Sequence, residues 1–325
     1  MPGPSVGDIE VLSAVAAGAA QPTGVIAGPE GRIWFTSIGN DRLGVVDPAS
    51  GRVETFADPA GNVHLPANVY PGPDGRIWFT SLGSDRIGRL DPAAADPAAT
   101  IETFTAPGME KPVAIKLAAD GRIWFSLRGA DALGSVDPLA AEPATTIGLV
   151  RAAGIAAPAA IFPASDGRLW WVDSEARTIA RLDPRAEDPA ASVEQIAGPP
   201  LIDEARAWAE DGRGRVWLTV RGTDTLLCFD PAAPDPAAGV VVVEAAAIRE
   251  PDGIWGGGDG GIWFANTGTN SIGRLDPGAE DPAATLRCFG APPEVEDPFD
   301  IKSGPGGWLW FTNRAGNSLG RIFAG

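Results

Sequence analysis

Residues 74–92 read DGRIWFTSLGSDRIGRLDP, and close copies of this stretch recur along the whole chain. Successive copies are 44 to 47 residues apart, measured between their central tryptophans at Trp34, Trp78, Trp124, Trp170, Trp217, Trp263 and Trp310. A period in the forties is typical of helical-hairpin repeats and of four-stranded propeller blades.

The composition of each copy favours strands. Every copy contains two or more prolines and several glycines, which would interrupt any helix of ten residues. RIWFTS and RLGVVD in the first copy are short, rich in β-branched and aromatic residues, and bounded by Gly, Asp and Pro, as strands are. The sequence therefore predicts an all-β protein, a seven-bladed β-propeller with four antiparallel strands per blade. In the first blade we expect them near residues 24–27, 32–37, 42–47 and 52–57.

The two ends of the chain complement each other. The last copy stops after its third strand, in residues 317–325, whereas residues 8–15 form a strand that precedes the first blade. We expect this N-terminal strand to complete the last blade and close the ring, which removes open sheet edges. Residues 1–325 would then form a single domain, and a closed ring with an acidic surface is expected to be a monomer.

The charge balance restricts the possible partners. Lys plus Arg total 25 and Asp plus Glu total 42, a net charge of −17, which repels nucleic acid and anionic membranes. We therefore expect no nucleic-acid or membrane partner. Residues 1–10 show no basic, apolar signal segment, and Cys228 and Cys288 are interpreted as buried free thiols of a reducing compartment, so we expect a cytoplasmic location.

The repeated and the non-repeated positions point to different roles. The seven tryptophans stand at one register, which predicts that they fill the wedges between neighbouring sheets. Ligands of propellers bind where the inner strands converge, so residues there that differ between blades are candidates for function. The candidates on the predicted inner strands, or directly after the W-F-T segments, are Thr23, Asn68, Asp173, Arg206, Asp252, Asn266, Phe299, Asp300 and Asn313.

The opposite sector of the ring is predicted to be apolar, with Val113, Ala114, Leu127, Ala159 and Ala160 at the corresponding positions. A funnel with one polar and one apolar wall suits an amphipathic small molecule.

Several candidates also have structural interpretations. Arg206 and Asp252 could form an ion pair between adjacent blades, and Asn266 and Asn313 could cap turns. The only histidine, His64, lies in a polar loop, where it is either a surface residue or a base at the channel mouth. A divalent cation, Mg²⁺ or Ca²⁺, could be held by Asp173, Asp252 and Asp300, although the chain has no D-x-D-x-D-G loop.

The unit P-x-G-I…G-P-D-G-R-I-W-F-T…R-I-G-R-L-D-P resembles the repeat of the streptogramin B lyase (virginiamycin B lyase) family over essentially the whole chain. It resembles the gluconolactonase-like propellers less closely. The first resemblance implies a seven-bladed propeller that opens the ester of a cyclic depsipeptide by elimination, with a histidine-centred base and a bound magnesium ion.

The same resemblance locates a departure. In the family, two inner strands of the last two blades read P-H-A-I and P-H-G-I, and the strand after the first ends W-F-T-E. Here Asp252 and Phe299 stand at the histidine positions and Asn266 at the glutamate. An ordinary aspartate is a much weaker base than histidine, so elimination by the family's residues is not expected.

Three functions remain open from the sequence. The first is a lyase-like propeller that binds, or also transforms, a cyclic or lactone-type natural product at the channel mouth. Its catalytic candidates are Asp252, Asn266, Asp300 and His64, with the other candidates as ligand contacts. The second is a protein-interaction platform, and the third is a metal-dependent lactonase of the gluconolactonase-like type.

Overall fold

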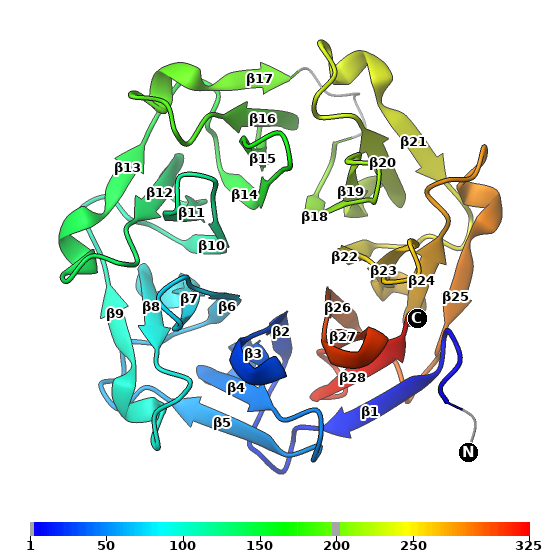
Figure 1. Cartoon of the computed structure of the whole chain (residues 1–325), viewed down its shortest axis with the longest axis horizontal. Helices are drawn as coiled ribbons and strands as arrows, with labels where there is room; N and C mark the ends of the chain where they lie inside the picture. The colour runs from blue at the N-terminus through cyan, green and yellow to red at the C-terminus, as the bar shows by residue number, and fades with distance from the viewer. Residues whose placement is uncertain (1–2, 174, 197–201) are drawn as a thin grey trace.

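The computed structural model describes residues 3–173, 175–196 and 202–325, and within them seven four-stranded antiparallel sheets form a ring (Figure 1). The strands nearest the axis are β2 (Pro22–Ala27), β6 (Pro66–Pro71), β10 (Pro112–Leu117), β14 (Pro158–Pro163), β18 (Ala205–Glu210), β22 (Pro251–Gly256) and β26 (Pro298–Ser303). The second strands are β3 (Ile33–Ser37), β7 (Ile77–Ser81), β11 (Ile123–Leu127), β15 (Leu169–Asp173), β19 (Val216–Val220), β23 (Ile262–Asn266) and β27 (Trp308–Asn313).

The third strands are β4 (Arg42–Val46), β8 (Arg86–Leu90), β12 (Ala132–Val136), β16 (Thr178–Leu182), β20 (Thr225–Phe229), β24 (Ser271–Leu275) and β28 (Ser318–Phe323). The outer strands are β5 (Val53–Ala57), β9 (Glu102–Phe104), β13 (Gly148–Val150), β17 (Glu194–Ile196), β21 (Val241–Glu244), β25 (Arg287–Phe289) and β1 (Ile9–Ser13). The predicted all-β, seven-bladed propeller is confirmed, with strand ends that differ by a residue or two from the expected ones.

The ring closes as predicted. Strand β1 pairs antiparallel with β28, from Ile9 opposite Ile322 to Ser13 opposite Ser318, and so becomes the outer strand of the last blade. Figure 1 shows this N-terminal strand lying beside the C-terminal blade. The first and last segments of the chain thereby protect each other's sheet edges.

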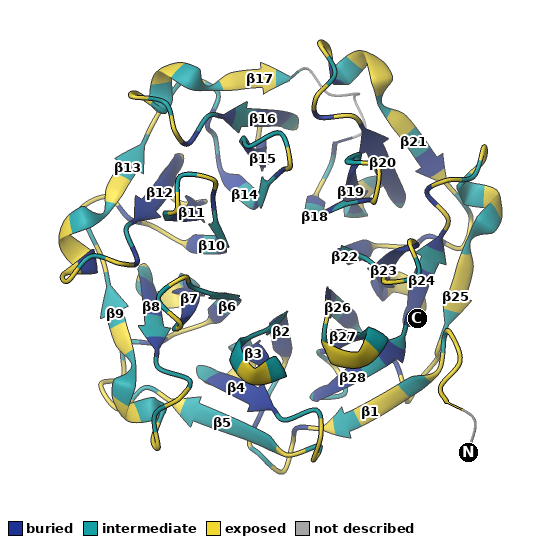
Figure 2. Cartoon of the chain, in the orientation of Figure 1, coloured by how far each residue is buried: buried dark blue, intermediate teal, exposed yellow. Residues whose placement is uncertain are grey.

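The core lies between neighbouring sheets. All seven repeated tryptophans are at most 2% exposed, and inner and second strands are more buried than the rim (Figure 2). In five blades an aspartate of the preceding turn accepts the indole N–H, as Asp74 does from Trp78 at 3.0 Å. The indole N–H groups of Trp34 and Trp310 are buried without a partner. In these two blades Glu30 and Gly306 replace the aspartate that stands four residues before the tryptophan in most other blades.

A repeated contact links each blade to the next. The residue before the first residue of every inner strand has a positive φ of 45° to 52°, a conformation that non-glycine residues rarely adopt. In six blades its N–H donates to an Asp or Asn of the preceding blade, as Leu65 does to Asp41 at 2.7 Å. These four Asp and two Asn side chains therefore connect neighbouring blades.

The inner strands share an irregularity that shapes the channel. The pairing of each inner strand with its second strand shifts register between its first and fourth residues, for example between Pro251 and Ile254. Such a bulge changes the direction of the side chains within it, here those of the two residues after the first residue of each inner strand. The tertiary structure thus decides which of these side chains reach the axis.

Two further features complete the fold. Neither cysteine is in a disulfide; Cys288 is exposed rather than buried, and burial raises the pKa of the Cys228 thiol to about 12. In the described part of the chain, no helix has the length and apolar character needed to cross a bilayer.

Candidate functional site

A cavity of about 1080 Å³ lies where the seven inner strands converge, and each of these strands contributes to its lining. Six of the ten predicted site residues line this cavity, namely Thr23, Asn68, Arg206, Asp252, Phe299 and Asp300. This volume is sufficient for a large small-molecule ligand.

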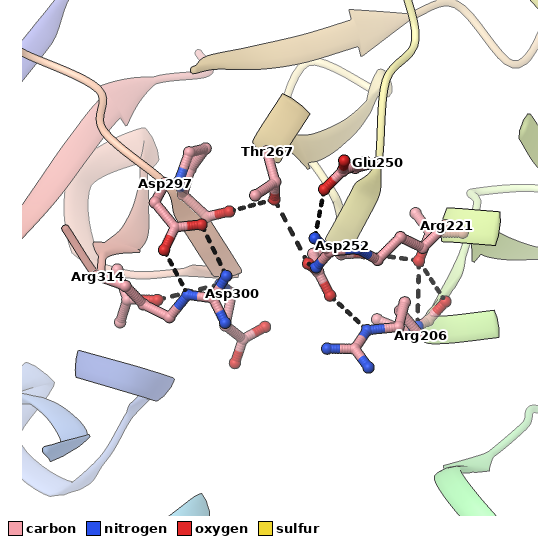
Figure 3. A network of polar contacts seen from close by, with 12 residues as sticks. Arg206, Arg221, Glu250, Asp252, Thr267, Asp297, Asp300 and Arg314 are labelled. Atoms are coloured by element: carbon pink, nitrogen blue, oxygen red, sulfur yellow. Dashed lines mark hydrogen bonds and ion pairs between the residues drawn. The ribbon is translucent and has the colours of Figure 1, made fainter. Parts of the chain in front are cut away.

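Asp252 is the centre of the charged wall. Its carboxylate is 2% exposed, and it accepts the Arg206 Nε–H at 2.6 Å through Oδ1 and the Arg221 Nη1–H at 2.8 Å through Oδ2 (Figure 3). The hydroxyl of Thr267, which donates to the Pro298 carbonyl at 2.5 Å, also lies 3.4 Å from Oδ2. Both oxygens are therefore engaged by protein donors, and the predicted ion pair between adjacent blades is present.

Arg221 is shared between two acids. Its guanidinium contacts Glu250 as well as Asp252. Burial acts to lower the pKa of Arg221, but the charges of Asp252 and Glu250 outweigh burial and raise it. The arginine therefore stays cationic.

Phe299, the residue at the second family histidine position, lies among guanidinium groups. Arg206 stands 5.5 Å and Arg314 4.2 Å from the centre of its ring. The carboxylate of Asp297 accepts two hydrogen bonds from Arg314 (Figure 3). Oδ1 accepts from Nη2 at 2.7 Å, and Oδ2 accepts from Nε at 2.9 Å. Phe299 offers an aromatic face to this wall and no group that transfers protons.

Asp300 connects the last blade to the first blade and also lines the cavity. Its Oδ2 accepts the backbone N–H of Val25 in the first blade at 3.1 Å. Its Oδ1 accepts the Ile301 N–H at 2.9 Å and the Lys302 ammonium at 2.5 Å. Like Asp252, this carboxylate is fully engaged with the protein.

Three other predicted residues lie inside the blades and do not line the cavity. Asp173, Asn266 and Asn313 each accept a backbone N–H from the loop that leads into their own inner strand, at 2.8, 2.8 and 3.3 Å. Ser37 and Ser81 accept the equivalent N–H at 2.7 and 2.8 Å in other blades. Different residue types therefore make the same loop contact, and the capping interpretation of the two asparagines describes what they do.

His64 is outside the cavity too. Its side chain is half-exposed, and its Nδ1 lies 3.2 Å from Oδ2 of Asp41. The geometry fits the surface interpretation of this histidine.

The described residues do not fit a metal ion. Among them no three His, Cys, Asp or Glu side chains converge, and Asp173 is separated from the cavity that Asp252 and Asp300 line. Arginines already occupy both oxygens of Asp252, and the Asn266 amide is bonded to its loop. A magnesium ion of the family type therefore has no matching set of ligands here.

The opposite wall is largely apolar. Val113, Ala114, Ala159 and Ala160 line the cavity as predicted, whereas Leu127 is buried inside its blade. The aromatic side chains that the sequence analysis overlooked on the lining are Tyr70, Phe162, Trp208 and Trp255.

The sequence analysis also missed two lysines. Lys116 and Lys302 are each the fourth residue after an inner-strand proline, and both line the cavity. The other blades have Ile26, Tyr70, Phe162, Ala209 and Trp255 at this position. This position therefore differs between blades, and lysine is its only charged residue type. That contrast is the signal in the sequence that identifies Lys116 and Lys302.

The comparisons with known proteins agree with this architecture. The profile of the virginiamycin B lyase family matches residues 7–232, which end before β22 and β26. No curated protein sequence matches the chain. A streptogramin B lyase structure has a TM-score of 0.80 at 22% identity, covering 98% of both chains.

Two other solved structures are similar. Catalytically inactive virginiamycin B lyase from Staphylococcus aureus, determined with quinupristin, has a TM-score of 0.80 at 17% identity, covering 97% of this chain and 99% of that one. Hydrazine synthase of Kuenenia stuttgartiensis has a TM-score of 0.74 at 13% identity, covering 94% and 96%. Identities this low show a shared fold, which hosts unrelated activities.

Proposed function

The chain belongs to the virginiamycin B lyase family, and from that premise we propose that it binds a small amphipathic molecule of the cyclic or lactone type in its channel cavity. The observation that carries this proposal is the division of the cavity into two unlike walls. One wall, on β18, β22 and β26, presents Arg206 and the face of Phe299. The other, on β10 and β14, presents mainly small aliphatic side chains and Phe162, with Lys116 as its charged exception. Such a division suits a ligand that has both polar and apolar parts.

The charged wall supports binding more than the family's elimination. A general base needs an acceptor atom within reach of the substrate proton. Both oxygens of Asp252 already accept hydrogen bonds from arginines, and Phe299 has no acceptor at the other histidine position. The structure supports a receptor-like use of the lyase fold.

Titration calorimetry with quinupristin and with simpler macrocyclic lactones tests this proposal. We expect saturable binding to the wild-type chain, and binding about 10- to 150-fold weaker in Arg206→Ala, because loss of a charge-assisted contact costs about 1.5–3 kcal/mol. Arg52→Ala is the matched control, since Arg52 is an exposed arginine away from the cavity. We expect its affinity to equal that of the wild type.

Chromatography of the same mixtures separates binding from turnover. We expect the macrocycle to be recovered intact after long incubation, because no free base faces the cavity at the family positions. A linear ring-opened product would show the family's activity and contradict the proposed receptor-like role. Absence of binding to every macrocycle, or equal binding by Arg206→Ala, would contradict the proposed site.

A further inference from the structure

All three lysines of the chain line the same cavity. The other 22 of its 25 basic residues are arginine, and the lysines are Lys111, Lys116 and Lys302. Lysine differs from arginine in that its amine can lose a proton and act as a nucleophile. The cavity lining therefore holds every lysine of the chain, together with Arg128 and Arg206.

Lys116 is partly buried on β10 among groups that do not neutralise it. Its Nζ donates to the Ile115 carbonyl at 3.1 Å and to Oδ1 of Asn68 at 3.4 Å, and it lies 5.2 Å from the centre of the Tyr70 ring. Burial raises the pKa of Tyr70, so this phenol stays neutral. Within the described ranges, no carboxylate is at ion-pair distance from Lys116.

Lys302 has the opposite arrangement. It is 8% exposed, and its ammonium lies 2.5 Å from Oδ1 of Asp300 and 5.0 Å from the centre of the Trp255 ring. Burial, and next the positive charge of Lys302, lower the pKa of Lys116 to about 8, and Asp300 only partly offsets them. Desolvation together with the field of another cation is a known way to activate a lysine amine.

We propose that Lys116 is a nucleophilic amine that forms an imine with the carbonyl group of an aldehyde or ketone ligand bound in the channel cavity. This inference rests on the proposed use of the cavity for small molecules, and it names a reactive group that such a ligand carries. Asn68 and Tyr70 flank the amine, which faces the cavity that a ligand would enter.

The step balances without an oxidant or a reductant. The lone pair of the neutral amine attacks the carbonyl carbon, and the electrons of the C=O π bond move to oxygen. One proton moves from nitrogen to that oxygen, giving a carbinolamine. The hydroxyl group then leaves with the second nitrogen-bound proton as one water molecule, and the C=N bond forms. Hydrolysis reverses the sequence and releases the ligand.

Reductive trapping in the wild-type protein tests the proposal directly. Benzaldehyde with sodium cyanoborohydride at pH 7.5 converts each imine into a stable benzyl-lysine, which peptide mapping assigns to one of three lysines. At this pH an amine of pKa about 8 is neutral about two hundred times more often than an ordinary lysine. We expect Lys116 to be labelled at least tenfold faster than the exposed Lys111.

Two controls keep the result interpretable. In guanidinium-denatured protein all three lysines should react at similar rates, because the cavity no longer exists. Lys116→Arg should lose the fast phase while Lys111→Arg retains it. Equal labelling of Lys116 and Lys111 in folded protein would overturn the proposal, whether or not either variant folds.

The two proposals fail separately. Macrocycle binding without fast labelling of Lys116 would overturn only the imine. Fast labelling without binding of any macrocycle would overturn the proposed ligand class and leave the amine site standing.

Discussion

Strands β10 and β26 place a lysine at the same position, yet the two lysines differ chemically. Lys116 and Lys302 each follow their inner-strand proline by four residues, and each pairs with the core tryptophan of the next strand. The residue two positions earlier is Asp300 in β26 but Ala114 in β10. Lys302 consequently forms an ion pair with Asp300, with 2.5 Å between Nζ and Oδ1. The Lys116 amine instead donates only to neutral acceptors.

This comparison shows how a repeat protein makes a site. The fold supplies seven equivalent positions around one axis, and a single neighbouring residue decides whether a lysine there is an ion-pair partner or an open amine.

The largest effect is expected when the β26 pair is broken. Asp300→Ala leaves the buried Lys302 ammonium without its partner and removes the acceptor of the Val25 N–H. Breaking a buried pair from one side typically costs about 3–5 kcal/mol of unfolding free energy. Urea denaturation measures this loss; a stability within 1 kcal/mol of the wild type would show that the pair is not tight in solution.

Making β10 resemble β26 is the second prediction. Ala114→Asp places a carboxylate two residues before Lys116, as in the other strand, and an opposite charge raises the pKa of a lysine. We expect benzyl labelling of Lys116 at pH 7.5 to fall at least tenfold. Ala114→Asn is the matched control without charge, and it should keep most of the labelling. If Lys116 is labelled equally in both variants, the lack of a carboxylate at position 114 is not the reason for the reactivity of its amine.

The third prediction concerns pH. Because the pKa of Lys116 is lowered to about 8, labelling in the wild type should rise with pH and reach half of its maximum near pH 8. The charged groups that act on this amine are Lys302 and Asp300. Lys302→Gln removes a like charge and leaves Asp300 unpaired; both effects raise the pKa of Lys116 and move the midpoint upward.

At a fixed pH of 7.5 this shift appears as a loss of about threefold in labelling rate for every half unit of pKa. Lys302→Arg keeps the charge and should leave the midpoint near 8. A midpoint that moves down in Lys302→Gln would contradict the like-charge argument.

The smallest effect is expected at the third lysine. Lys111 is exposed, and it is its backbone N–H that bonds to Asp85. Lys111→Arg should therefore change the unfolding free energy by less than about 0.5 kcal/mol, as is usual for surface substitutions. Thermal unfolding checks this; a larger loss would mean that its side chain has a structural role.

The candidate site was only partly predictable. Thr23, Asn68, Arg206, Asp252, Phe299 and Asp300 line the cavity because the bulge after the inner-strand proline turns these positions toward the axis. Asp173, Asn266 and Asn313 differ between blades as the others do, but their oxygens bond to a loop that is near only in the folded blade. A residue that differs between blades can therefore line the cavity, or it can make a structural contact that several residue types are able to make.

The sequence alone determined the number of blades, the strand order, the tryptophan core and the closure by the N-terminal strand. These follow from a fixed period and from short β-branched and aromatic runs bounded by turn residues, which are local properties of the chain. Only the tertiary structure decided that arginines occupy both oxygens of Asp252, that Lys302 is paired and that Lys116 is not. Charge pairing depends on distances of a few ångströms between blades far apart in sequence, and such distances exist only once the ring has closed.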